Sequence, residues 1–286
     1  MELTSEQLTE LKAVEKELLK SFVSVCDTLQ LKYYLLEGSL LGTVRHKGFI
    51  PWDDDIDIGM PRKDYELFCS NGQKLLPEYY FVQTIATEKD YRANFAKIRD
   101  SRTTFIETSV RHCEINHGIY IDIFPLDYCL ENEDLQQQRF REQSLMNARI
   151  SMGFYSEKRK MSLKGHIAKF LSLLKYPTIR SALTAREKWM KALPKSDMYA
   201  NYCSAWFKKE IIPVKWFGDG EYLEFEGLLV RVPKEYDKWL EHVYGNYMQP
   251  PPEDKRTTHH YADVIDVAKP YTFYRQHNNE KSETKR

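Results

Sequence analysis

The chain has 286 residues, of which 42% are hydrophobic and 13% aromatic, enough to bury a substantial core in one large domain or two ordinary ones. Its 42 basic and 42 acidic residues cancel, which argues against nucleic acid as the main partner. Five cysteines without any C-x-x-C spacing argue against a disulfide framework and the common zinc sites. Without a signal-peptide pattern or a membrane-spanning apolar run, we expect a soluble cytoplasmic protein, at most peripheral at the cytoplasmic face of the membrane.

Residues 1–30 predict an amphipathic helix. Thr4 and Gln7 have the spacing of a capping box at its start. Five apolar residues fall near one face of this helix: Leu8, Leu11, Leu18, Phe22 and Val25. We therefore expect the helix to pack on the protein core.

Residues 31–36 predict a short buried strand that ends at Gly38 and Ser39, with a helix beginning near Leu40. A strand that runs into Gly-Ser and a helix start presents backbone N–H groups that favour an anion. The same pair of residues is also typical of an ordinary turn, so this signal alone is weak.

An acidic cluster follows, with aspartate at positions 53, 54, 55 and 57 between apolar residues. In a strand over residues 50–58, Asp53, Asp55 and Asp57 would share one face and Asp54 would lie on the other. Asp55 and Asp57 would then lie about 7 Å apart, a separation that a divalent cation bridges while it removes their repulsion.

Two other interpretations of this cluster compete with a catalytic metal site. The first is a solvated acidic turn, although Trp52, Ile56 and Ile58 interleave the acids as core residues would. The second is a calcium loop that begins at Asp53. That loop needs glycine at its sixth position, where this chain has Ile58, so the calcium-loop pattern fails.

Asp122 stands in the apolar, β-prone run GIYIDIFPLD, where a solvent-facing role is hard to arrange, although chance burial near a strand edge is an alternative. A Gly-Ser turn, an Asp-x-Asp strand and one more aspartate on a neighbouring strand make the metal site of the nucleotidyltransferase fold. We therefore predict Asp55, Asp57 and Asp122 as catalytic residues and as ligands of Mg²⁺ or Mn²⁺. Asp53 is expected behind these ligands.

The chain resembles the LicD family of bacterial phosphocholine transferases, relatives of the fukutin-type phosphotransferases, over nearly its whole length. The matching segments are residues 37–68, 95–105, 118–127, 225–233 and 244–260, and the first of them, EGSLLGTVRHKGFIPWDDDIDIGMPRKDYELF, is highly specific. Asn246 stands where the family more often carries aspartate.

The resemblance implies metal-dependent transfer of phosphocholine from CDP-choline onto a sugar hydroxyl, with release of CMP. The acceptor would be a cell-surface glycan precursor, such as one of teichoic acid, lipopolysaccharide or capsule, and it would be lipid-linked. CDP-ribitol and CDP-glycerol are alternative donors for the same chemistry.

The resemblance also implies phosphate contacts from Gly38 and Ser39 and from cationic side chains. Lys97 and Arg99 alternate with apolar residues, so they share one face of a predicted strand. The predicted cations are Arg45, Lys97, Arg99, Lys255, Arg256, His259 and His260. The adjacent histidines diverge on a strand, so we interpret them as phosphate or acceptor contacts, and zinc stays an alternative without support from the sequence.

A choline head group would favour an aromatic cage through cation–π attraction. Trp206, Trp216 and Tyr222 are candidates for such a cage, although large aromatic residues are also ordinary core residues. Ribitol or glycerol would instead need hydrogen-bonding side chains.

The segment from residue 157 to 191 has ten basic and two acidic residues, so its local charge is ten minus two, or +8. Within it an apolar stripe recurs at helical spacing: Leu163, Ile167, Phe170, Leu171 and Leu174. Two interpretations are open. The helix lies on an anionic membrane surface, or its apolar stripe covers the core. A lipid-linked acceptor favours the membrane.

Towards the C-terminus, EYLEFEGLLVRVP alternates like a strand, residues 234–244 predict a helix opened by Pro233, and residues 275–286 predict a disordered tail. We predict one α+β unit, a nucleotidyltransferase-like mixed sheet flanked by helices, with a helical basic insertion. Its parts are an N-terminal helix (1–30), a catalytic core (31–130), a helical basic region (131–200), the C-terminal part of the core (201–274) and a tail (275–286).

Two other function classes stay open. An Asp-x-Asp glycosyltransferase also uses a nucleotide-activated donor and a metal, but it would transfer the sugar itself and would not need the Gly-Ser turn. A non-catalytic glycan- or choline-binding module would be marked by repeated aromatic motifs, which this sequence lacks.

Overall fold

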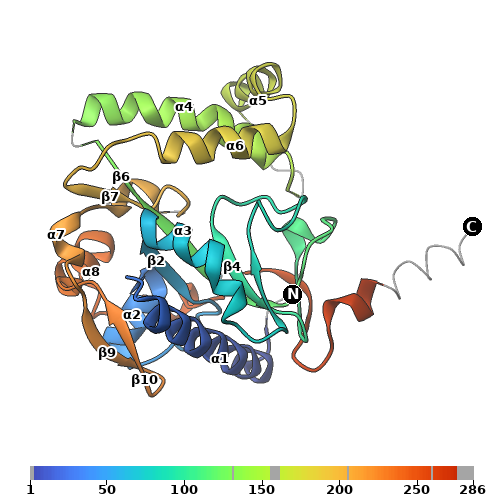
Figure 1. Ribbon diagram of the computed structural model, residues 1–286, viewed down its shortest axis with the longest axis vertical. Coiled ribbons are helices and arrows are strands. Elements are labelled where there is room, and N and C mark those ends of the chain that lie inside the picture. Colours follow the sequence, from blue (N-terminus) through green and yellow to red (C-terminus); the bar gives the residue numbers. More distant parts are fainter. Residues whose placement is uncertain (1–2, 131, 155–161, 205, 259, 276–286) are drawn as a thin grey trace, which may run out of the picture.

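The computed structural model describes residues 3–130, 132–154, 162–204, 206–258 and 260–275. Figure 1 shows a mixed β-sheet in the middle of the molecule, a layer of helices along one side and a long N-terminal helix on the opposite side. The predicted α+β class is confirmed.

The central sheet has the strand order β1-β2-β6-β4-β3, in which β2 and β6 run parallel and the other neighbours antiparallel. Its strands are β1 (Tyr34–Leu35), β2 (Asp57–Pro61), β3 (Tyr80–Gln83), β4 (Ala96–Asp100) and β6 (Ile119–Tyr128). The last residues of β6 pair with β7 (Met198–Ala200), which in turn pairs with β8 (Ile211–Pro213). The strand β6 therefore reaches from the middle of the sheet to the helical layer.

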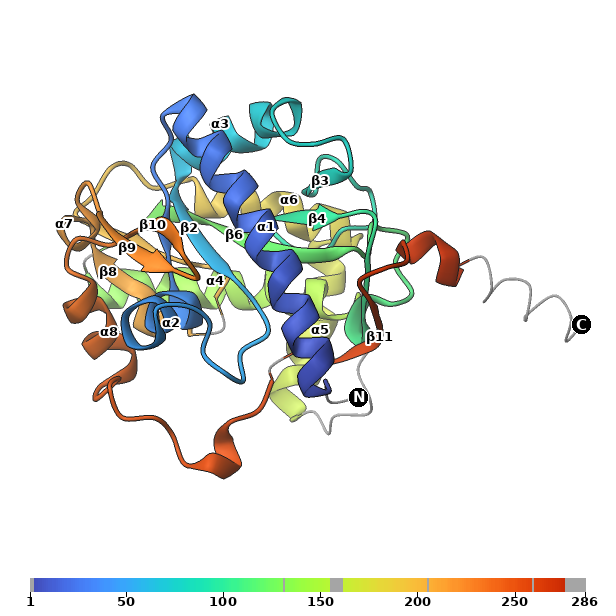
Figure 2. The ribbon, with the colours of Figure 1, turned by 90° about the horizontal axis from the view of Figure 1, so that it is seen from below.

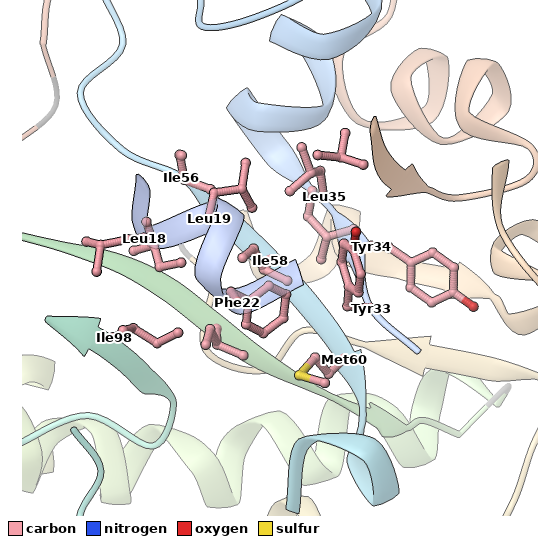
Figure 3. Packing of buried hydrophobic residues seen from close by; sticks show 14 of the residues in the cluster. Leu18, Leu19, Phe22, Tyr33, Tyr34, Leu35, Ile56, Ile58, Met60 and Ile98 are labelled. Atoms are coloured by element: carbon pink, nitrogen blue, oxygen red, sulfur yellow. The ribbon is translucent and has the colours of Figure 1, made fainter. Parts of the chain in front are cut away.

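Helix α1 (Ser5–Leu29) covers one face of this sheet, as the predicted periodicity requires, and crosses β6 and β4 in Figure 2. The predicted capping box is present, because Thr4 Oγ1 accepts from the Gln7 N–H and the Gln7 side chain accepts from the Thr4 N–H. The side chains of Leu18 and Phe22 lie with Ile58 and Ile98 in the core shown in Figure 3. Burial of each such side chain stabilises the fold by about 1.5–3 kcal/mol.

The predicted strand over residues 50–58 is wrong for most of its length. Strand β2 begins only at Asp57, and the Asp53 N–H donates to the Ile50 carbonyl in a turn. The physical reason is that Pro51 has no N–H to donate to a strand partner. The turn that forms instead brings the neighbouring aspartates close together. The predicted strand over residues 31–36 is likewise reduced to β1.

The C-terminal half adds a hairpin and short helices beside this turn. The alternating stretch EYLEFEGLLVRVP forms two strands, β9 (Glu221–Phe225) and β10 (Leu228–Val232). Glu226 and Gly227 between them both have positive φ, which suits a two-residue hairpin. The helix predicted at 234–244 is confirmed as α8 (Tyr236–Tyr244).

The remaining elements lie around these. They are α2 (Glu37–His46), α3 (Arg62–Asn71), β5 (Thr104–Glu107), α7 (Val214–Phe217) and β11 (Ala262–Asp266), with β11 paired to β5. The tail predicted as disordered falls, from residue 276 onward, outside the described residues.

The basic region is helical, as predicted, and has a small core of its own. It contains α4 (Glu133–Ser151), α5 (Leu163–Lys175) and α6 (Ile179–Met190). Met146 of α4, Leu183 of α6 and Tyr202 meet in this second core. The apolar stripe of α5 lies outside it and is exposed, so the interpretation that the stripe covers the core is wrong.

Candidate active site

A cavity with a volume of about 680 Å³ lies between the start of α2, the turn over residues 50–56 and the segment after α8. Carboxylates line one part of it, and aromatic and basic side chains line the rest. The acidic lining residues are Glu37, Asp53, Asp55 and Asp57, and the aromatic ones are Trp52, Trp206, Tyr244 and Tyr247.

Two of the predicted ligands meet because their strands are neighbours. Asp57 at the start of β2 lies directly opposite Asp122 on the parallel strand β6. On the other side of β6, Lys97 of β4 lies opposite Asp122, and its Nζ is 2.8 Å from Asp122 Oδ1. Residues opposite each other on neighbouring strands project from the same face, so this row places two carboxylates and one ammonium side by side.

Gly38 and Ser39 lie in the first turn of α2, so this helix begins before the predicted Leu40, and the two residues position this row. The Ser39 Oγ accepts a hydrogen bond of 2.8 Å from the Asp57 N–H, and so holds the first residue of β2 against α2. A Cβ on Gly38 would stand 2.4 Å from Asp53 Oδ2, so a side chain at this position would displace that carboxylate. Gly38 lines the cavity, whereas Ser39 is buried and already accepts one hydrogen bond.

The turn over residues 50–56 concentrates three more carboxylates. Carboxylate oxygens of Asp53, Asp54 and Asp55 all lie within 4.8 Å of one another. Asp54 faces away from the cavity and accepts from the His260 N–H at 3.1 Å, with His260 Nδ1 at 3.3 Å. Asp55 lines the cavity, 3.8 Å from the same Nδ1. Asp54 and Asp55 thus both lie beside His260 Nδ1, and the opposite faces predicted for them in a β-strand are not observed.

The electrostatics of the cavity indicate an excess of negative charge. Burial and then the charges of Asp55 and Asp54 raise the pKa of Asp53 well above its usual range. Burial, followed by repulsion from Asp55, Glu37 and Asp122, does the same to the pKa of Asp57. Carboxylate oxygens crowded in this way are the ligands that hard divalent cations prefer, so the donor set fits Mg²⁺ or Mn²⁺.

His260 responds to the same charges in the opposite direction. Burial alone would lower the pKa of His260, but its hydrogen bond to Asp54 and the charges of Asp55 and Asp54 raise it to about 9. The imidazole is therefore a cation at neutral pH and belongs to the wall of the cavity.

A second acidic pair was not predicted from the sequence. Glu37 has a φ of 48° at the start of α2, and its Oε1 accepts from Asn201 Nδ2 at 3.3 Å. Burial and the neighbouring charge of Glu210 raise the pKa of Glu37, and burial raises that of Glu210 to about 7. The two residues are far apart in the sequence, so their pairing could not be predicted. The one sequence signal was that Glu37 directly precedes Gly38 and Ser39, and no signal pointed to Glu210.

The predicted cations are divided between the cavity and the core. Arg45, Lys255 and His260 line the cavity, and Arg45 Nη1 donates to the Tyr247 carbonyl at 2.7 Å. Arg256 lies over the Trp52 ring at 5.2 Å and donates to the Pro251 carbonyl. His259 lies outside the described residues.

Lys97 and Arg99 share one face of β4, as predicted, but of the two only Lys97 forms an ion pair with the predicted metal ligand Asp122. Arg99 is fully buried and donates to Gln83, the Gly118 carbonyl and Glu107. Through these three hydrogen bonds the Arg99 guanidinium connects neighbouring strands and loops, and it does not line the cavity.

The three residues suggested for an aromatic cage do not come together. Trp206 lines the cavity, but Trp216 packs beside His242 and the Tyr222 hydroxyl accepts from Arg231. The aromatic wall is instead formed by Trp206 with three side chains that the sequence did not single out: Trp52, Tyr244 and Tyr247. Asn246 also lines the cavity, and its Nδ2 is 3.3 Å from Gln249 Oε1.

Comparisons with known proteins give one family match and several relatives. Residues 30–161 match the family model described as LicD/FKTN/FKRP, nucleotidyltransferase domain. A lipopolysaccharide cholinephosphotransferase LicD of Haemophilus influenzae is 29% identical over 266 residues, which cover 90% of this chain and 97% of that protein. The human ribitol 5-phosphate transferase FKRP is 29% identical over 114 residues, 38% of this chain and 20% of that protein.

A third relative is an uncharacterised protein of Rickettsia prowazekii, 33% identical over 132 residues, which cover 44% of this chain and 46% of that protein. Among the described residues, no helix combines the length and apolarity that crossing a bilayer requires. The family match spans β2, β4 and β6 and so contains Asp55, Asp57, Lys97 and Asp122. Residues 30–161 therefore carry a LicD-family domain.

Proposed function

We propose that this protein is a metal-dependent phosphotransferase that moves phosphocholine from CDP-choline onto a sugar hydroxyl of a cell-surface glycan precursor and releases CMP. The functions of two relatives, cholinephosphotransferase and ribitol 5-phosphate transferase, support transfer of a phospho-alcohol. CDP-ribitol or CDP-glycerol is the second candidate donor, favoured by the ribitol relative.

The observation that carries the proposal is that Asp57 lines the cavity together with Asp55 and lies opposite the buried Asp122 on the neighbouring strand. We assign these three carboxylates to hold Mg²⁺ or Mn²⁺. The bound cation would stabilise negative charge on the diphosphate of the donor. Asp53, behind Gly38, would support the site without binding the cation directly.

Asp122 is the proposed acceptor of the proton from the sugar hydroxyl. Burial raises its pKa while Lys97 opposes that rise, and a carboxylate of raised pKa is a better base. The sugar oxygen forms a bond to the phosphorus that bears the alcohol. The bond from that phosphorus to the bridging oxygen breaks, and CMP leaves with the electron pair.

The other walls of the cavity would bind the rest of the donor. Arg45, Lys255 and the cationic His260 would contact its phosphates, and Gly38 offers backbone close to the carboxylates. The aromatic wall of Trp52, Trp206, Tyr244 and Tyr247 favours a quaternary ammonium over a polyol, because ring faces attract cations. This wall is our reason to put choline before ribitol.

A donor screen tests the proposal. Purified protein is incubated with a sugar acceptor and with CDP-choline, CDP-ribitol, CDP-glycerol or UDP-sugars, and the released nucleotide is identified by chromatography. We expect CMP from CDP-choline in the presence of Mg²⁺ and none in excess EDTA. Asp27→Asn, which changes an exposed carboxylate on α1, is the matched control for Asp55→Asn and should keep the activity.

Other results would replace the proposal. Release of UDP from a UDP-sugar would make the protein a glycosyltransferase, and binding of choline without release of any nucleotide would make it a binding module. CMP release that persists at full rate in EDTA would contradict the proposal that the reaction needs a bound metal ion.

A further inference from the structure

Helix α5 presents its large apolar side chains to solvent. The exposed fractions of Leu163, Phe170 and Leu174 are 77%, 62% and 71%, and Ile167 and Leu171 of the same apolar stripe are also exposed. Figure 1 shows α5 at the outer corner of the helical layer, beside α4. Monomeric soluble proteins rarely leave such a contiguous patch uncovered.

The orientation of α5 is the reverse of what a core helix needs. With 3.6 residues per turn, Gly165, Ala168 and Ser172 fall on one side of the helix, and the apolar stripe falls about 180° away. Ser172 is the one residue of α5 that is fully buried in the described structure. The small residues therefore face the protein, and the large apolar residues face outward.

The charges beside the stripe specify what can cover it. Lys164 and Lys175 are exposed along one edge, and α5 contains no acidic residue. Within the described residues neither lysine forms an ion pair.

We propose that α5 is a membrane-docking helix, which inserts its apolar stripe among the acyl chains of a bilayer rich in anionic phospholipid. The lysines at the edge would contact lipid phosphates while their apolar stems lie along the interface. A second copy of the chain fits less well, because two facing stripes would bring lysines against lysines. The inference is independent of the donor and of the proposed chemistry.

Vesicle co-sedimentation of the full chain tests this surface. We expect binding to phosphatidylglycerol-containing vesicles, little binding to pure phosphatidylcholine, and release when salt is raised from about 0.1 M to about 0.5 M, because screening weakens the lysine contacts. Phe170→Gln with Leu174→Gln should lower partitioning about tenfold or more, since both side chains would enter the bilayer. Lys164→Gln with Lys175→Gln should weaken binding to anionic vesicles only.

Matched controls change equally exposed residues elsewhere. Leu67→Gln with Leu229→Gln removes exposed apolar side chains from α3 and β10, and Lys63→Gln with Lys89→Gln removes exposed positive charges. Neither pair should alter vesicle binding. Because the stripe is exposed, the α5 variants should also keep the thermal midpoint of the wild-type protein.

Three results would overturn the proposal. Unchanged vesicle binding by the Phe170→Gln, Leu174→Gln variant would remove the stripe from the interface. A large fall in its thermal midpoint would show that the stripe is packed within the protein. A wild-type dimer that this variant converts to monomers, without vesicle binding by either, would assign the stripe to contacts between copies.

Discussion

Two groups of buried carboxylates lie along the same strand, β6, and they are balanced in different ways. Near its end, Asp127 accepts hydrogen bonds of 2.7 and 2.5 Å from Arg62, which also donates to Glu187 at 2.7 Å. Around Asp122, one ammonium, from Lys97, lies among the carboxylates of Asp57 and its neighbours.

The difference shows how a chain distinguishes structural acids from acids kept for a ligand. Burial lowers the pKa of Arg62, but the hydrogen bond to Asp127 and the charges of Asp127 and Glu187 outweigh that effect and raise it. Lys191 lies 3.1 Å from Glu187, so this group contains two cations and two carboxylates and is neutralised by the protein itself. At the cavity, burial and then repulsion among acids raise the pKa of Asp57, as expected where the neutralising cation comes from solution.

The largest expected effect is loss of activity at the unbalanced group. Asp57→Asn should lower the rate of CMP release by about three orders of magnitude, because a ligand of the proposed cation is lost. Its metal-free thermal midpoint should be unchanged or higher, since repulsion is relieved. A near-normal rate with Mg²⁺ would contradict the assignment, and Asp27→Asn serves as control.

The reverse pattern is expected at the balanced group. Asp127→Asn leaves the buried Arg62 without its bidentate partner and should lower the free energy of unfolding by about 3 kcal/mol. The rate of CMP release per folded molecule should change little. Denaturant unfolding and a rate measurement on the same sample check the two expectations. A rate that falls while stability is unchanged would contradict the difference proposed between the Asp127 group and the Asp57 group.

Stability should depend on pH through the acidic pair beside the cavity. A carboxyl whose pKa is raised by folding stabilises the protein below its unfolded pKa, and this stability is lost as pH rises through the folded pKa, about 7 for Glu210. The metal-free protein should therefore lose stability between about pH 4.5 and 7.

The substitution Glu210→Gln sharpens that measurement. It mimics the protonated side chain, so it should stabilise the protein by about 1–3 kcal/mol at pH 8 and by little at pH 5. Thermal midpoints across this pH range, with EDTA, provide the comparison. An equal effect of the substitution at both pH values would mean that Glu210 does not titrate on folding.

The smallest effect is expected behind the cavity wall. Asp54→Asn should lower the rate about tenfold, less than Asp55→Asn, because it acts through His260. The pKa of His260 in the metal-free protein, followed by NMR, should fall from about 9 towards its ordinary value. An unchanged pKa of His260, or a loss of rate as great as that of Asp55→Asn, would contradict the view that Asp54 acts through His260.

Local patterns predicted the parts of the molecule that local physics determines. The capping box and spacing of apolar residues located α1, and the apolar run around Asp122 located β6. The turn at Ile50 to Asp53 was missed because alternation along a sequence does not reveal whether a strand partner exists. Asp55 and Asp57 nevertheless line one cavity, since the turn and β2 direct them there.

Pairings between distant segments were beyond the sequence alone. Glu37 meets Glu210 only because α2 and the segment before β8 lie together, and the aromatic wall gathers residues from three separate parts of the chain. Arg99 looked equivalent to Lys97 on the same strand face, yet Gln83 and Glu107 retain it inside the protein.

The length of β6 also sets a limit on dissection of the protein. The family match ends at residue 161, but β6 shares backbone hydrogen bonds with β7 at Asp127 and Tyr128, and β7 follows much later in the chain. A fragment that stops at residue 161 would leave this end of β6 as an open edge, a template for pairing with other chains, and would also remove Glu187 from Arg62. A fragment that ends where the family match ends is therefore expected to aggregate, because it would expose an unpaired strand edge.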